Sequence, residues 1–172
     1  AYCARRAAEQ RALAAPDMPL LSFLRKFAEA VAGAKVSPSA PEAVSMGYLR
    51  ESDPVVMHPD ALLAAAVHHA LGLARSGYRP PPAEPFVVAG RDGAATLRAQ
   101  LVNMRDGGFI SEHDYLLGCT VAHVLCGGDV DADTEVDEAW MLRLEREAFI
   151  SLLGQPKTQE RIGGLLKTGK PV

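Results

Sequence analysis

Three side chains that bind metals in other proteins stand at helical spacing: Cys119, His123 and Cys126, four and then three residues apart. A zinc site needs four ligands and polar groups that orient them. The neighbours of these three side chains are Leu, Val and Ala. We therefore interpret Cys119, Ala122 and Cys126 as small residues that let another helix approach closely, and His123 as a core or interface histidine.

A histidine pair and one glutamate are the other side chains whose types could support chemistry. His68 and His69 are adjacent in a helical segment and point about 100° apart, so they cannot grip one ion together; we expect one to be packed and the other solvated. Glu145 is a candidate catalytic carboxylate, but no second acid or histidine stands at a helical offset from it. We expect it to form a structural ion pair with an arginine, because a carboxylate in an apolar arc needs a partner.

Phosphate-binding and nucleophile motifs are missing from the sequence. The turn Gly127-Gly128-Asp129 lacks the strand-then-helix setting and the lysine of a phosphate loop, so we interpret it as a helix terminator. No G-x-S-x-G signature is present. The residues therefore predict a helical domain with no catalytic, cofactor-binding or metal-binding residue of its own.

The elements that would position any site are helices, because helical periodicity dominates and no alternation typical of strands is sustained. We predict an all-α fold, with residues 54–57 briefly extended. The expected helices cover residues 2–14, 18–32, 40–46, 59–76, 94–105, 112–126, 137–153 and 156–168. Four prolines between residues 78 and 85 indicate a stiff connector. We therefore divide the chain into residues 1–77, a connector at 78–90, and a C-terminal four-helix subdomain at 91–172.

Two helices are informative about packing. Residues 115–126 are apolar on nearly every side, which predicts the central helix of the second half. Ser111 and Asp114, three residues apart, predict a capping box at the start of this helix. The helix at 137–153 carries two neighbouring apolar stripes with Glu145 between them, and we expect Leu144 and Phe149 to lie in the core. The stripes contain Met141, Leu144, Ala148 and Leu152 in one case, and Leu142, Phe149 and Leu153 in the other.

Composition limits the class of protein. A chain of 172 residues is long enough for one domain with a core. Its net charge of −3 gives no basic surface for nucleic acid or an anionic membrane. No apolar run reaches the roughly 18 to 20 residues that span a bilayer. Three cysteines do not make a disulfide framework, so we expect a reducing cytoplasm.

Several segments resemble a known family. Residues 39–43 (SAPEA) and 47–49 (GYL) are similar to a stretch that follows the catalytic half of the enoyl-CoA hydratase/isomerase (crotonase) domain, with Tyr48 and Leu49 in place of the commoner Leu-Val. Four further segments resemble, in order and spacing, the C-terminal end of bacterial fatty-acid β-oxidation proteins that join a 3-hydroxyacyl-CoA dehydrogenase region to a crotonase-like region. They are residues 110–114 (ISEHD), 124–128 (VLCGG), 144–149 (LEREAF) and 166–171 (LKTGKP).

The resemblance implies that this chain is the helical C-terminal part of a longer enzyme. The chain starts at Ala1 without Met, in helix-forming composition, and we expect it to be cut from a longer polypeptide. Residues 1–77 would be helices of the second half of the crotonase-like region. The NAD-binding region, the oxyanion-hole amides and the glycine-rich segment would precede Ala1. NAD and acyl-CoA would therefore bind the parent protein, and the isolated chain would have no dehydrogenase, hydratase or isomerase activity.

Partners and rival functions follow from the same reasoning. The expected partner is the remainder of the parent polypeptide. We also expect a homodimer through one apolar helix stripe, because an uncovered patch of large side chains is rarely tolerated on a monomer. The stripe consists of Leu20, Leu24, Phe27 and Val31. The alternatives are an autonomous helical interaction module and a cysteine/histidine metal or redox sensor.

Overall fold

The computed structural model describes residues 1–169 and confirms the helical class for them. Most predicted helices lie within a few residues of their expected bounds. The helix expected at 94–105 begins earlier, at Gly90, and the segment 54–57, expected to be extended, forms neither helix nor strand. The elements are α1 (Tyr2–Ala14), α2 (Leu20–Ala32), α3 (Ala40–Ser45), a 3-10 turn (Pro59–Ala61), α4 (Leu62–Arg75), β1 (Phe86–Val87), α5 (Gly90–Asp106), α6 (Glu112–Leu125), β2 (Glu135–Val136), α7 (Glu138–Leu153) and α8 (Pro156–Thr168).

The chain forms two compact units whose boundaries differ from the expected division. Unit 1 contains Ala1–Val36 and Pro85–Val172, and unit 2 contains Ser37–Glu84. The second boundary falls inside the proline-rich connector, at residues 84 and 85. The first boundary was not expected, because residues 33–39 looked like a short link between helices of one region. Residues 170–172 of the expected C-terminal subdomain lie outside the described residues.

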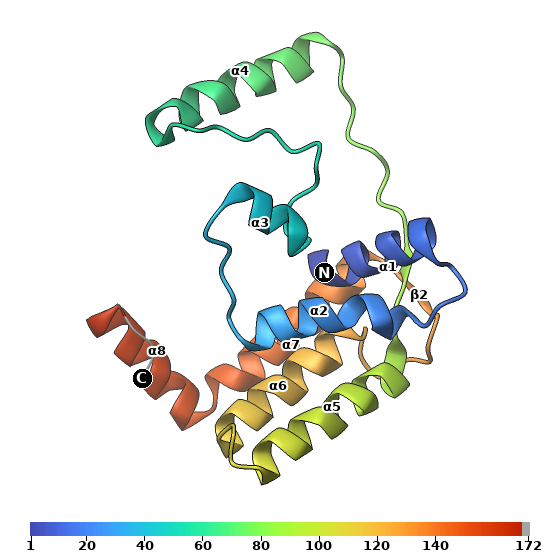
Figure 1. Ribbon diagram of the computed structural model, residues 1–172, viewed down its shortest axis with the longest axis vertical. Coiled ribbons are helices and arrows are strands. Elements are labelled where there is room, and N and C mark those ends of the chain that lie inside the picture. The colour runs from blue at the N-terminus through green and yellow to red at the C-terminus, as the bar shows by residue number, and fades with distance from the viewer. Residues whose placement is uncertain (170–172) are drawn as a thin grey trace. The chain divides into compact units, whose positions relative to one another are not determined.

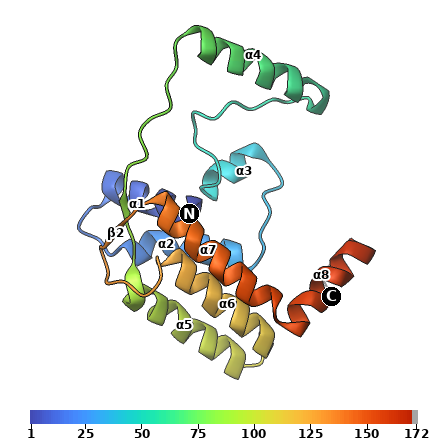
Figure 2. The ribbon, with the colours of Figure 1, turned by 180° about the vertical axis from the view of Figure 1, so that it is seen from behind.

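Unit 1 is organised around α6, which contacts α2, α5 and α7 (Figures 1 and 2). The prediction that this apolar helix is central is confirmed. The helices α1 and α2 pack against each other across a short turn and close one side of the core. The largest fully buried side chains come from α2, from the β1–α5 junction, and from the start of α7, with Cys126 after α6. They are Phe27, Leu24, Met141, Val88 and Cys126.

The apolar stripe of α2 is the inner face of this core. Leu20, Leu24 and Phe27 are buried inside unit 1, and Val31 is exposed. The expectation that these side chains form an uncovered patch is therefore wrong for Leu20, Leu24 and Phe27. Its physical error was to assume that α2 packs on polypeptide outside this chain, whereas α1 and α6 cover it. Whether the chain dimerises stays a prediction, but not through these three residues.

Two short strands were missed. β1 pairs antiparallel with β2, with Phe86 opposite Val136 and Val87 opposite Glu135. Each strand has two residues, which is too short for alternation to show in the sequence. The pairing brings Phe86, Val88 and Ala89 into the core, so the end of the proline-rich connector is part of unit 1.

The glycines after α6 end the helix, as expected. Gly127 and Gly128 have φ angles of 90° and 86°, a region that glycine adopts far more readily than other residues. A β-carbon on Gly127 would lie 2.5 Å from the side chain of Val88. The carbonyl of Gly127 accepts a hydrogen bond of 3.0 Å from the Trp140 indole. This turn therefore fixes the end of α6 against the β1–α5 junction and the start of α7.

Unit 2 buries little. Ala43 of α3 is its buried hydrophobic side chain, and no residue of α4 is buried. His68 and His69 are both exposed, so the expectation that one of them packs is wrong. The reason is that α4 has no buried residue among those described, so the helix offers no packed face to either histidine. The exposed apolar side chains of α4 are Leu62, Leu63, Val67, Leu71 and Leu73.

None of the helices described in the structure is long and apolar enough to cross a membrane.

Candidate functional site

The three potential ligands on α6 and its C-terminal end have separate surroundings. Cys126 is fully buried, and burial raises the pKa of its thiol to about 12. A β-carbon on Gly93 of α5 would lie 3.3 Å from the Cys126 sulfur, so this cysteine is the close helix contact that its small size predicted. His123 faces Asp129, with Nδ1 3.7 Å from a carboxylate oxygen. Within residues 1–169, no group of three or more His, Cys, Asp and Glu side chains is placed to hold a metal ion.

Cys119 lies beside an aromatic side chain. A hydrogen bond with Cys119 raises the pKa of the Tyr115 phenol. The guanidinium of Arg105 stacks over the Tyr115 ring, 4.4 Å from its centre. These contacts join α5 to the first turns of α6. They are contacts between neighbouring helices, and Cys119 lies half-buried among them.

The start of α6 forms a polar contact with α8. Ser111 and Asp114 form the predicted capping box, in which each side chain binds the other residue's backbone N–H. Arg161 of α8 donates a hydrogen bond of 2.6 Å to the same carboxylate. These donors, Arg161 first and Ser111 second, hold the pKa of Asp114 well below its usual range. Sequence reasoning identified the cap but not Arg161, which lies 47 residues away.

A buried histidine lies next to this contact. His113 is the buried polar side chain of unit 1, and its Nε2 lies 3.1 Å from the Thr158 hydroxyl of α8. Sequence reasoning did not single out His113. No residue of α8 is buried, so the Asp114–Arg161 and His113–Thr158 pairs are polar anchors for an otherwise exposed helix.

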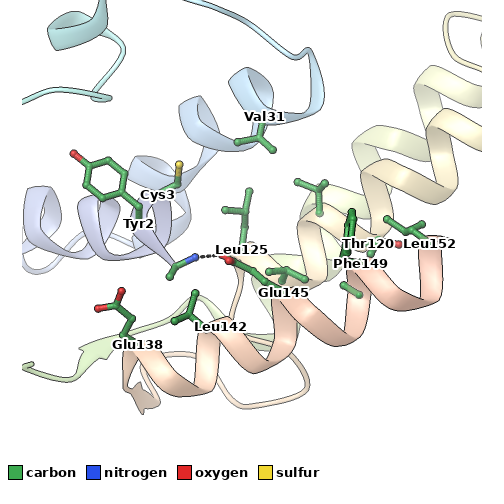
Figure 3. A pocket seen from close by; sticks show the side chains of 14 residues that line it. Tyr2, Cys3, Val31, Thr120, Leu125, Glu138, Leu142, Glu145, Phe149 and Leu152 are labelled. Atoms are coloured by element: carbon green, nitrogen blue, oxygen red, sulfur yellow. Dashed lines mark hydrogen bonds and ion pairs between the residues drawn. The ribbon is translucent and has the colours of Figure 1, made fainter. Parts of the chain in front are cut away.

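Glu145 has a partner other than the predicted one. Its carboxylate accepts a hydrogen bond from the Ala1 ammonium group (Figure 3). The expectation of an arginine partner is therefore wrong, although the expectation of an ion pair is confirmed. The two residues are separated by 144 positions, and they meet because α1 lies across α7. The periodicity of one helix carries no information on such a contact.

Unit 1 has a groove of about 550 Å³ along α1, α6 and α7, with Val31 at the end of α2 also in its lining. We call it the α1–α7 groove. Figure 3 shows Glu145 at its centre, with Leu142 and Phe149 on either side along α7. Most of its lining is apolar. The lining residues are Ala1, Tyr2, Cys3, Val31, Thr120, Val121, Val124, Leu125, Glu138, Leu142, Glu145, Ala148, Phe149 and Leu152.

One wall of this groove comes from both apolar stripes of α7. Leu142 and Phe149 of the second stripe line it, together with Ala148 and Leu152 of the first. Leu144, from the first stripe, packs against the core, as predicted. Phe149 is 59% exposed and Leu142 is 46% exposed, so the prediction that Phe149 is a core residue is wrong.

The polar groups of the groove are already engaged. Glu138 accepts a hydrogen bond of 2.9 Å from Arg5, and the Thr120 hydroxyl donates to the Leu116 carbonyl. Burial raises the pKa of the Cys3 thiol, which disfavours the reactive thiolate. The groove thus offers an apolar surface around two ion-paired carboxylates, Glu138 and Glu145, an arrangement suited to binding rather than to acid–base or nucleophilic catalysis.

Comparison with known proteins gives one informative similarity. The chain is 42% identical over 154 residues to a protein of Bacillus subtilis (strain 168) described as a probable 3-hydroxyacyl-CoA dehydrogenase. The matched part covers 90% of this chain and 19% of that protein. The chain therefore spans about a fifth of the length of its relative. No protein-family model matches the sequence, and no solved structure matches it.

Proposed function

We propose that this chain is a helical, non-catalytic region of a 3-hydroxyacyl-CoA dehydrogenase, with a structural and assembly role in that enzyme. The observation that supports the proposal is the 42% identity, which extends over 90% of the chain. Identity at this level over nearly the whole chain is what a region shared by two related proteins would give. In this proposal the enzyme oxidises 3-hydroxyacyl-CoA with NAD, and both bind outside this chain.

The proposal extends to a crotonase-like region. The segment 39–49, which resembles crotonases, forms the short helix α3. Ser39 accepts a hydrogen bond from the backbone of Glu42, and Gly47 follows the helix with a φ of 83°. This capped helix agrees with the short helix that the sequence predicts for residues 40–46. We further propose that the same polypeptide carries an enoyl-CoA hydratase-like half in the cytoplasm.

A non-catalytic role fits the chemistry of the described residues. Burial raises the pKa of the Cys126 thiol to about 12, and His123 faces the Asp129 carboxylate. His113 is buried beside the Thr158 hydroxyl, and neither member of this pair lines the α1–α7 groove. General acid–base catalysis needs such a pair within hydrogen-bonding distance of a reacting group. We therefore expect this region to position other parts of the enzyme.

The second candidate is an autonomous helical interaction module. It is favoured by α4, whose large apolar side chains are exposed along the helix. A helix of this kind needs a covering partner. In the first proposal the partner is the rest of the same polypeptide, and in the second it is a separate protein.

The complete reading frame and two activity assays test the proposal. We expect a polypeptide several times longer than 172 residues that oxidises 3-hydroxyacyl-CoA with NAD. We expect the 172-residue chain to show no turnover of 3-hydroxyacyl-CoA or crotonyl-CoA above a buffer blank. Turnover by the short chain would contradict the non-catalytic role. A long gene product without dehydrogenase activity would contradict the assignment to the enzyme.

A further inference from the structure

The α1–α7 groove is a largely apolar surface that is exposed on unit 1. Leu142 and Phe149 of α7 line it together with Tyr2 and Val31, and all four side chains are exposed. Soluble proteins seldom leave such a contiguous apolar patch uncovered. The groove lies wholly within unit 1, whose own core is already complete below it. The surface is therefore available to a partner without any rearrangement of the core.

The length of the relative indicates what covers the groove. The matched stretch is 19% of that protein, so about four fifths of its length has no counterpart here. The backbone nitrogen of Ala1 lies in the groove, in contact with Glu145 (Figure 3). The longer polypeptide of the proposed function therefore contains additional chain that can cover the groove.

We infer that the α1–α7 groove is the docking surface for the remainder of the dehydrogenase polypeptide, which packs apolar side chains against Leu142 and Phe149. The inference rests on the proposed function, because it takes the longer polypeptide from there. In that polypeptide the nitrogen of Ala1 is an uncharged amide. Glu145 then needs a cationic or hydrogen-bonding group from the docked surface, because a carboxylate enclosed by apolar side chains is costly without one.

Two other occupants would fit the groove by size or by composition. Its volume of about 550 Å³ lies in the range of small-molecule sites, so an apolar ligand such as a fatty acid is one. A second copy of the chain is the other. The observations favour the remainder of the polypeptide, because about four fifths of the relative's length lies outside the matched stretch.

Thiol labelling of Cys3 distinguishes these occupants. Cys3 lines the groove, whereas Cys126 is buried in the core and serves as the internal control. The 172-residue chain and the full-length gene product are treated with iodoacetamide, and each cysteine is followed by peptide mass spectrometry. We expect Cys3 to be labelled at least about tenfold more slowly in the full-length protein, because docking closes the groove. Equal rates in the two proteins would overturn the inference.

The short chain alone provides the test of the rival occupants. Protection of Cys3 that grows with protein concentration would identify a second copy, and protection by added palmitate would identify an apolar ligand. Either result would overturn the docking of the remainder. The dehydrogenase activity of the long protein is measured separately. A protected Cys3 in an inactive long protein would contradict the proposed enzyme and leave the docking surface standing.

Substitutions give a second readout. In the full-length protein, Leu142→Glu with Phe149→Glu should lower the melting temperature by several degrees and restore Cys3 labelling. The matched control is Phe109→Glu, because Phe109 is 81% exposed and lies outside the groove. In the 172-residue chain, neither change should alter the melting temperature. If the groove variant behaves like Phe109→Glu in the long protein, the docking surface lies elsewhere.

Discussion

Two helices of similar length and composition, α6 and α4, have opposite surroundings. Both contain 14 residues, rich in Leu, Val and Ala. α6 buries five of its residues, whereas α4 buries none. α6 is joined to α5 by a turn of five residues, so that the two helices become packed neighbours. α4 lies between irregular segments, at 46–58 and 76–85, that bring no helix against it.

The comparison separates two kinds of information in an apolar helix. Apolar residues on every side indicate that the helix must be covered. They do not indicate whether the same chain supplies the cover. For α6 the cover comes from α2, α5 and α7, and for α4 we expect it from polypeptide beyond this chain. The exposed wall of the α1–α7 groove is, like α4, an apolar surface that we expect to be covered by polypeptide beyond this chain.

The largest expected effect comes from the core around α6. Phe27 is fully buried, and Phe27→Ala should reduce the free energy of unfolding by about 3–5 kcal/mol, because it removes a large side chain and leaves a cavity. Phe149→Ala is the matched control, and it should cost less than about 1 kcal/mol in the isolated chain. Urea denaturation followed by circular dichroism measures both. Equal losses would show that the groove wall is part of the core.

A smaller effect compares glycines in the middle of the two helices. A β-carbon on Gly118 of α6 would lie 2.9 Å from Leu101, whereas one on Gly72 of α4 would meet nothing within 4 Å. Gly118→Ala should therefore destabilise unit 1 by about 1–2 kcal/mol through overpacking. Gly72→Ala should increase the helix content of α4, because alanine favours a helix over glycine by about 0.5–1 kcal/mol. Thermal melts measure the loss of stability in Gly118→Ala, and far-ultraviolet circular dichroism measures the gain in helix content in Gly72→Ala. A destabilising Gly72→Ala would indicate that α4 is covered in this chain.

The smallest effect concerns the polar anchor of α8. Asp114→Asn should lower the stability of the folded chain by about 0.5–1 kcal/mol near neutral pH. The figure is discounted for solvent screening, since the Asp114 side chain is 38% exposed. The pKa of Asp114 is depressed in the folded state, so this stabilisation is fully present above about pH 4, the ordinary carboxyl value, and is lost as the pH falls toward the folded pKa.

Urea midpoints at several pH values measure this dependence. The gap between the wild-type chain and Asp114→Asn should narrow as the pH falls from about 5 toward about 2. Asp106→Asn is the control, because Asp106 pairs with Arg105 on the surface and does not contact α8. A gap that stays constant across this range would show that the carboxylate charge contributes nothing to the contact with Arg161.

Sequence reasoning was most successful where the information is local. The bounds of α1 and α8, the capping box at Ser111 and the glycine terminator at Gly127 depend on residues a few positions apart. Contacts between distant residues were missed, including Ala1 with Glu145 and Arg161 with Asp114. The groove was missed for the same reason. Its lining comes from four helices, and in the sequence only the second stripe of α7 indicated that an apolar face remained without a partner.

The boundaries of the two units could not be predicted from the sequence for a different reason. The prolines near residue 80 indicated an extended connector, but they could not show that the chain returns to pair β1 with β2. Residues 33–39 carry glycine and proline signals that mark a loop, and a loop looks the same whether it joins two helices or two units. Packing between α2 and α6 decided this boundary, and such packing depends on side chains about 100 residues apart.

Hydrogen–deuterium exchange of α6 and α4 tests the central claim most directly, that this chain is one region of a longer polypeptide which covers its exposed apolar surfaces. The amides are followed by mass spectrometry in the 172-residue chain and in the full-length gene product. We predict slow exchange in α6 in both proteins, and fast exchange in α4 in the short chain that becomes slow in the long protein. Exchange in α4 that is equally fast in both proteins, or already as slow as in α6 in the short chain, would contradict the account.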